Sequence, residues 1–257
     1  MARRRAMGEK VQIEFELQMG SEGVRVTLAV PTAPVAARRV LPIFQGVTNQ
    51  VVDVAVTTVT KRGETVSCKA GCGACCRTLV PVSFTEARQL RALVDAMPEP
   101  RRTEVRARFA DAVARLEAAG MLEEMRDFDA RPDAEYLTLH PRYFALGLPC
   151  PFLEDESCSI YAHRPLVCRE YLVTSPAELC SDPTSRLVTR VPLPAFPSLA
   201  VCNLEGPDPK HARLALALAL VWTDEHAGEA ETLRPASEWI DVVLGGITAQ
   251  QQKPAPA

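Results

Sequence analysis

Two stretches near the amino terminus alternate between apolar and polar residues. Residues 11–19 place Val, Ile, Phe, Leu and Met at every second position, and residues 24–30 repeat the pattern. An alternation with a period of two is typical of a strand with one buried face. Gly20-Ser21-Glu22-Gly23 lies between the two stretches and is typical of a turn. The pattern predicts a β-hairpin, preceded by a disordered basic tail over residues 1–10.

Apolar residues with helical spacing follow the hairpin. Residues 43–59 have this spacing, although many of them are β-branched, and they favour a helix. Ser83-Phe84-Thr85-Glu86 has the form of a capping box and predicts a helix that ends at Met97-Pro98-Glu99-Pro100. A long amphipathic helix is expected from about residue 105 to 120. Its polar face mixes arginines with acidic residues, which is typical of a solvated surface.

The carboxyl-terminal half is less regular. Residues 128–149 are mixed in character and predict loop with short segments. Residues 183–197 contain four prolines, which favours an extended connection. Asp208-Pro209 places a good N-cap residue before a proline, and the residues after it are apolar nearly all round. We therefore expect a buried helix over about 209–226.

A final short helix is expected over residues 238–244, ended by Gly245-Gly246. Residues 248–257 are predicted to form a disordered tail, which leaves residues 11–247 as a single domain. These patterns predict an α+β, mainly helical fold with an N-terminal β-hairpin. In this fold the helices pack around a loop-rich metal site that the cysteines form.

Composition and charge narrow the class of protein. A chain of 257 residues with 47% hydrophobic residues can bury a full core. A formal net charge of -3 argues against a nucleic-acid partner, which usually requires a basic domain. The longest apolar run, Leu214–Trp222, is much shorter than the ~20 residues that span a bilayer, and no apolar segment follows the basic start. We therefore expect a cytoplasmic protein with no membrane partner.

The cysteines are the strongest chemical signal. The chain contains nine, and four of them fall in the nine residues 68–76, where Gly71 and Gly73 are expected to allow a positive φ. Four more follow about seventy residues further along. Disulfides are typical of short secreted chains. The odd number of cysteines and the adjacent pair Cys75-Cys76 favour metal-binding thiolates instead.

The two cysteine groups are interpreted as converging on one thiolate metal site. Zinc takes four ligands and an iron–sulfur cluster takes about four cysteines, so eight thiols fit two metals, a thiolate-bridged pair, or one cluster with spare thiols. Arg164 and Arg169 flank Cys168 and could bind the cofactor by donating hydrogen bonds to sulfur; the alternative is ordinary surface arginines. His163 is a further candidate ligand, with an ordinary polar role as the alternative. Cys202 is interpreted as a small buried residue, with a ninth ligand or a reactive thiol as the alternatives.

Three motifs resemble one known family. They are Cys68-x3-Cys72-x2-Cys75-Cys76, Cys150-Pro151-Phe152-Leu153, and the segment 158–169 with Cys158, Arg164-Pro165 and Cys168-Arg169. This pattern, over residues 68–180, resembles the YkgJ-type cysteine-cluster family, which implies a zinc- or iron-chelating domain. One related branch, the flagellin lysine methylases, carries an iron–sulfur cluster on the same pattern. The resemblance implies that the metal ligands are Cys68, Cys72, Cys75, Cys76, Cys150, Cys158, Cys168 and Cys180.

Three functions follow from these patterns. The first is a metal-binding protein in which zinc, iron or an iron–sulfur cluster joins two segments and supplies folding energy. The second is an iron–sulfur-dependent protein-modifying enzyme related to the flagellin lysine N-methylases. The third is metal delivery or sensing. The chain shows no HExxH motif, no Ser-His-Asp arrangement and no recognisable glycine-rich cofactor loop. The sequence therefore leaves open whether the protein is an enzyme.

Overall fold

The protein is described by a computed structural model over residues 3–19, 22–130, 133–182, 187–205 and 212–251. The strands are β1 (Arg3–Met7), β2 (Lys10–Met19), β3 (Glu22–Pro31), β4 (Pro34–Ala36), β5 (Pro81–Ser83), β6 (Leu153–Glu154), β7 (Ser157–Cys158), β8 (Arg213–Ala215) and β9 (Leu233–Pro235). The α-helices are α1 (Leu41–Lys61), α2 (Phe84–Asp95), α3 (Arg101–Ala118), α4 (Leu122–Arg126), α5 (Asp133–Ala145), α6 (Leu166–Glu170), α7 (Pro197–Val201), α8 (Ala219–Glu225) and α9 (Ala236–Gln251).

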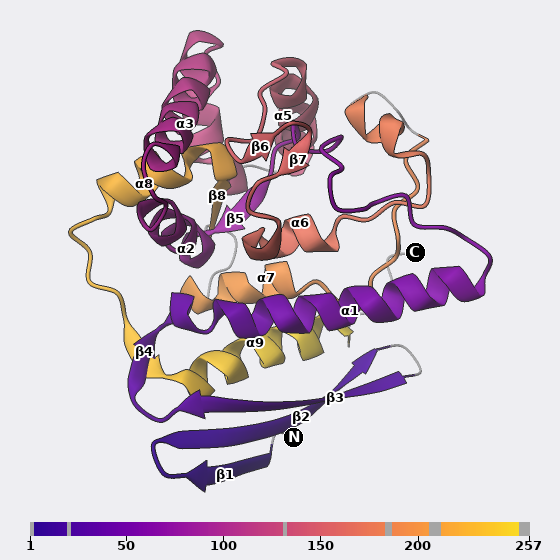
Figure 1. Cartoon of the computed structure of the whole chain (residues 1–257), viewed down its shortest axis with the longest axis vertical. Helices are drawn as coiled ribbons and strands as arrows, with labels where there is room; N and C mark the ends of the chain where they lie inside the picture. The colour runs from indigo at the N-terminus through magenta and orange to yellow at the C-terminus, as the bar shows by residue number, and fades with distance from the viewer. Residues whose placement is uncertain (1–2, 20–21, 131–132, 183–186, 206–211, 252–257) are drawn as a thin grey trace.

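The fold is α+β and mainly helical, as the sequence predicts. Figure 1 shows the β1-β2-β3 sheet at one end, α1 and α9 beside it, α6 and α7 next, and α2, α3 and α5 at the other end. One hydrophobic core joins the sheet to α1, α7 and α9, and a second joins α2, α3, α5 and α8. Cys150 and Cys158 pack against the second core, whereas Leu166 of α6 belongs to the first. The later cysteine segments therefore lie where the two cores meet.

The predicted hairpin is confirmed. Strands β2 and β3 pair antiparallel, with Ile13 opposite Leu28 and Phe15 opposite Val26. Ile13, Phe15 and Val26 are buried, because one face of the sheet lies against the first core. The predicted turn begins at Gly20-Ser21, which lie outside the described residues.

The prediction of a disordered tail over residues 1–10 is wrong for the part of it that the structure describes. Arg3–Met7 form β1, which pairs antiparallel with β2 and places Arg4 opposite Ile13. Arg4 also forms an ion pair with Asp241 of α9. The strand is exposed along its length, so the apolar pattern that reveals a strand is missing. Its backbone pairing with the edge of β2 holds it in place.

Helix α1 confirms the helix predicted over 43–59, and it buries Phe44, Val47 and Val51 along one face. Helix α9 departs from its prediction. It runs through Gly245-Gly246 to Gln251, so residues 248–251 of the predicted disordered tail are helical. A Cβ atom at Gly246 would lie 2.5 Å from Asn203 Nδ2 and 3.1 Å from Ala200 Cβ. Gly246 therefore allows α7 to approach α9 closely and does not end the helix.

We expect Gly246→Ala to lower the free energy of unfolding by about 1–3 kcal/mol, because the added methyl overpacks the α7–α9 contact. Gly245→Ala is the matched control, since a Cβ at Gly245 has no atom within 4 Å. This change should raise the free energy of unfolding by about 0.5–1 kcal/mol, because alanine favours a helix interior over glycine. Urea unfolding of both variants measures the difference. Equal effects would contradict the close approach at Gly246.

The capping box is confirmed at the start of α2. Ser83 Oγ accepts a hydrogen bond from the Glu86 backbone N–H at 3.1 Å, and a carboxylate oxygen of Glu86 accepts from the Ser83 N–H at 3.0 Å. Met97-Pro98-Glu99-Pro100 separates α2 from α3, as expected.

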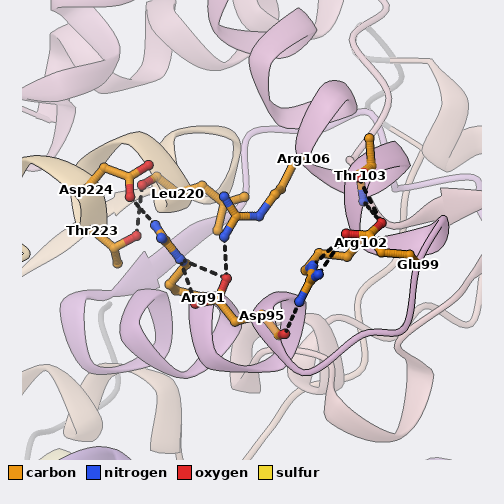
Figure 2. A network of polar contacts seen from close by, with 9 residues as sticks. All are labelled: Arg91, Asp95, Glu99, Arg102, Thr103, Arg106, Leu220, Thr223 and Asp224. Atoms are coloured by element: carbon orange, nitrogen blue, oxygen red, sulfur yellow. Dashed lines mark hydrogen bonds and ion pairs between the residues drawn. The ribbon is translucent and has the colours of Figure 1, made fainter.

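The arginines of α3 take part in a surface network (Figure 2). Arg106 bonds to Asp95 at the end of α2, and Asp95 also accepts from Arg91 Nε at 2.9 Å. Arg102 bonds to Glu99 at 2.9 Å. Because each of these cations has an acidic partner and is partly or fully exposed, the network agrees with the predicted solvated surface.

The buried helix predicted over 209–226 begins later. Arg213–Ala215 form β8, which pairs with β5 and places Leu214 opposite Val82. A 3-10 helix over Leu216–Leu218 leads into α8, and Asp208-Pro209 lie outside the described residues. The segment is buried as expected, but pairing with a distant strand, which the local pattern does not show, determines its conformation.

Residues 128–149 were predicted as loop with short segments, but they contain the thirteen-residue helix α5. Leu139 and Tyr143 are buried four positions apart on this helix. Pro141 lies inside it and weakens the helical signal. The extended connection expected over 183–197 is present from residue 188 to α7, with an antiparallel bridge between Val173 and Arg190, and residues 183–186 lie outside the described residues. In the described part of the chain, no helix combines the length and apolarity needed to cross a membrane.

Candidate metal centre

The first cysteine loop, residues 68–76, depends on two glycines for different reasons. Gly71 has a φ of 86°, so the predicted positive φ is present there. Gly73 does not have a positive φ. A Cβ at Gly73 would lie 2.6 Å from the carbonyl oxygen of Glu156 and 2.8 Å from Leu153 Cδ1. The sequence interpretation of Gly73 was therefore wrong: this glycine is needed for close packing on the β6–β7 hairpin.

The four later cysteines come from four different local structures. Cys150 follows α5, Cys158 ends β7, Cys168 lies on α6, and Cys180 lies on the 3-10 helix Ala177–Ser181. Strands β6 and β7 are joined by Asp155-Glu156, whose φ angles of 47° and 56° are those of a tight hairpin turn. Short connections thus bring sulfur atoms of separate elements near the first loop.

Direct contacts join the early and late segments. The Cys150 backbone N–H donates to the Cys76 carbonyl oxygen at 2.7 Å, and the Ser67 N–H donates to the Val173 carbonyl at 2.9 Å. Arg77 donates to both carboxylate oxygens of Glu156, at 3.0 and 2.6 Å. Bidentate arginine–carboxylate hydrogen bonds fix the relative orientation of the two groups as well as their distance. The first cysteine loop is therefore held against the later segments at several points.

Seven of the eight predicted ligands line one cavity of about 500 Å³. The eighth, Cys68, is half-buried and lies within electrostatic range of Cys72 and Cys75. All nine cysteines are free thiols. The structure thus brings the two cysteine groups together without disulfides. The cysteines that line the cavity are Cys72, Cys75, Cys76, Cys150, Cys158, Cys168 and Cys180.

The environment of these thiols favours the protonated form when no cation is bound. Burial raises the pKa of Cys150 to about 12 and that of Cys180 to about 11. Burial also raises the pKa of Cys168 well above its usual value, and nearby thiols add to the effect. The pKa of Cys75 is raised first by its hydrogen bond with Cys76 and then by burial. A metal ion would replace these protons, because thiolates are the form that binds metal.

The donor set fits a zinc or iron centre. Eight soft sulfur donors are what zinc and iron–sulfur clusters prefer. Among the described residues, no three His, Cys, Asp or Glu side chains already surround one point closely enough to hold an ion.

The two predicted cofactor-binding arginines have different surroundings. Arg164 lines the cavity, lies within electrostatic range of Cys75 and Cys158, and places its guanidinium 4.1 Å from the centre of the Tyr161 ring. Arg169 is buried and lies within electrostatic range of Cys158 and Cys168, but its N–H groups bond to oxygen atoms. It donates to Asn49 Oδ1 at 3.0 Å, to the Arg164 carbonyl at 3.1 Å and to the Ala162 carbonyl at 2.5 Å. These contacts favour a cofactor role for Arg164 and a structural role for Arg169.

His163 and Cys202 lie apart from the cavity. His163 is exposed on a 3-10 helix and is not among the residues that line the cavity. Cys202 is buried and its thiol donates to the Ser198 carbonyl oxygen at 3.4 Å. Cys202 therefore occupies the position of a small buried residue, in agreement with the sequence interpretation.

Other side chains that no sequence motif indicated also line the cavity. His140 and Phe144 lie four positions apart on α5, and both line the cavity, as do Tyr161 and Tyr171. Burial lowers the pKa of His140, so its imidazole is neutral near pH 7. The spacing of His140 and Phe144 was the available signal. It was lost because this segment was predicted as loop.

Comparison with known proteins identifies the cysteine region. Residues 67–185 match the model of a family described as "putative zinc- or iron-chelating domain". This match confirms the cysteine-cluster family inferred from the motif spacing. No curated protein and no solved structure matches the chain significantly.

Proposed function

We propose that the eight thiols at the cavity hold a resident zinc or iron centre, since residues 67–185 match the model of a zinc- or iron-chelating domain family. One observation supports the proposal above the others: cysteines from five separate segments line the same cavity. Such a centre would join the first cysteine loop to α6 and to the β6–β7 hairpin. It would thereby contribute to folding, because metal-binding energy is available only to the folded chain.

Charge balance supports a role for Arg164 in this centre. Four thiolates on one Zn²⁺ carry a net charge of -2, and burying that charge without compensation is costly. The guanidinium of Arg164 lies near Cys68, Cys75 and Cys158. Its N–H groups can donate to bound thiolates, as groups around a metal commonly do. When bound, zinc would act as a Lewis acid or structural ion, and an iron–sulfur cluster would carry electrons.

A resident centre is favoured over metal delivery by the buried contacts that hold α6 in place. Cys168 lies on α6, next to the buried residues Arg169 and Glu170. Glu170 accepts hydrogen bonds from the backbone and side chain of Ser198 on α7, the first at 2.7 Å. A ligand on a helix held in this way is suited to retain a metal. The cavity also leaves space beside the thiols, which is the feature that an iron–sulfur enzyme would require.

Anaerobic purification followed by metal analysis tests the proposed centre and its metal. A zinc centre should give a colourless protein with about two zinc atoms per chain, since eight thiols supply two tetrahedral sites. An iron–sulfur centre should give a brown protein that absorbs near ~400 nm and bleaches on reduction. Anaerobic handling matters because oxygen can release iron from the thiols, and adventitious zinc can then bind in its place. A folded protein that binds neither metal, even after reconstitution, would contradict the proposal.

A further inference from the structure

The cavity at the cysteines extends beyond them. Its volume of about 500 Å³ falls in the range of small-molecule sites, about 300–1,000 Å³. Besides the cysteines, many of its lining side chains are apolar, and they come from the chain before β5, from α5 and α6, from the segment before α7 and from the 3-10 helix after β8. A metal centre does not require these side chains, because its ligands are all sulfur. Among them are Val80, Phe144, Val167, Val188 and Leu216.

Two arginines supply the positive charge in this cavity. Arg164 Nε is shielded from solvent and has no hydrogen-bond partner among the described residues. Arg190 lies at the rim, with its guanidinium 4.8 Å from the centre of the Tyr171 ring. An arginine has five N–H donors, so Arg164 can serve both a thiolate and a second acceptor. A buried donor without a partner is costly, which indicates that an acceptor joins it when the cavity is filled.

The remaining polar groups limit the class of ligand. His140 is neutral near pH 7 and can donate or accept one hydrogen bond. Asp182 contributes one negative charge at the cavity and disfavours a ligand of high negative charge. One or two guanidinium groups facing an apolar wall suit a single carboxylate on an apolar body, because guanidinium matches a carboxylate in shape and charge.

We propose that the cavity binds a small organic monocarboxylate, with its carboxylate at Arg164 and Arg190 and its apolar body against Phe144 and Leu216. This inference rests on the proposed function, because the loaded metal centre forms one wall of the site. The ligand lies beside the thiols and does not replace them. The protein would then present a bound carboxylate to its metal centre.

Benzoate tests the proposal on the metal-loaded protein, with benzyl alcohol and benzylamine as probes of the same size and inorganic phosphate as a probe without an apolar body. Ligand-observed NMR should show benzoate binding with a dissociation constant on the order of 1 mM. The other three probes should bind at least about tenfold more weakly. Equal binding of benzoate and benzyl alcohol would overturn the carboxylate class, and so would tighter binding of benzylamine or phosphate.

Substitutions of cavity residues test whether benzoate binds at the proposed place. Arg190→Gln should weaken benzoate binding about tenfold, and Val188→Trp should abolish it by filling the cavity. Arg38→Gln is the matched control, because Arg38 bonds to Glu231 away from the cavity, and it should leave binding unchanged. Metal content is measured on every sample. Retained metal without benzoate binding would overturn this inference alone, whereas loss of metal from the wild-type protein would count against the centre itself.

Discussion

Replacing Cys168 with serine is expected to release metal and to destabilise the protein in the same step. Cys168 lies on α6 and lines the cavity with six other cysteines. A serine hydroxyl is a poor ligand for zinc or iron compared with a thiolate. The variant should lose the stabilisation that bound metal gives, which is about 4 kcal/mol when the free metal exceeds its dissociation constant about 1,000-fold. Metal analysis and denaturant unfolding measure the two effects.

Cys202→Ser is the matched control for this experiment. Cys202 is buried, but it does not line the cavity and its thiol bonds to the Ser198 carbonyl. A serine at this position can make the same hydrogen bond. Metal content should therefore stay at the wild-type level, and a chelator should still lower the unfolding midpoint. If Cys168→Ser kept both its metal and its stability, the centre would not depend on α6.

The second large effect is expected at Glu86, which connects α2 to α6. One carboxylate oxygen of Glu86 accepts from the Ser83 N–H, and the other accepts from the Leu166 N–H at 2.9 Å. Glu86 is buried, and burial raises the pKa of its carboxyl group. Glu86→Ala leaves these buried donors without an acceptor, at about 1–3 kcal/mol each. We expect the free energy of unfolding to fall by about 2–4 kcal/mol.

The same substitution should weaken metal binding, since Leu166 begins the helix that carries Cys168. Glu117→Ala on the exposed face of α3 is the control and should change stability by less than about 0.5 kcal/mol. Calorimetry and competition with a metal chelator separate the two effects. A variant as stable as the wild type would show that Glu86 does not hold α6 in place.

Local signals predicted the parts of the fold that local interactions determine. The β2–β3 hairpin has a period-two pattern, and the capping box at Ser83 needs only residues three positions apart. Leu214 was assigned to a helix because its neighbours are apolar, but its strand pairs with β5, more than a hundred residues earlier. Gly246 was expected to end a helix, and only its packing on Ala200 explains its presence inside α9.

The candidate site likewise contains residues that local sequence signals predict and residues that only the tertiary structure reveals. The spacing of Cys72, Cys75 and Cys76 pointed to metal without any knowledge of the fold. The contributions of His140 and Tyr171 come from tertiary structure, because nothing near them in the chain indicates that they face the thiols. The different roles of Arg164 and Arg169 also depend on packing, which turns one guanidinium toward the cavity and the other toward carbonyl groups.

The separate position of Cys202 gives the chain two populations of thiol for alkylation chemistry. Eight cysteines belong to the region of the cavity, whereas Cys202 is only 2% exposed at the start of the 3-10 helix that follows α7. A reagent that labels free thiols would reach the first population after chelation and the ninth only after unfolding. Intact mass spectrometry of one labelled sample thus distinguishes molecules that lost their ion from molecules that lost their fold.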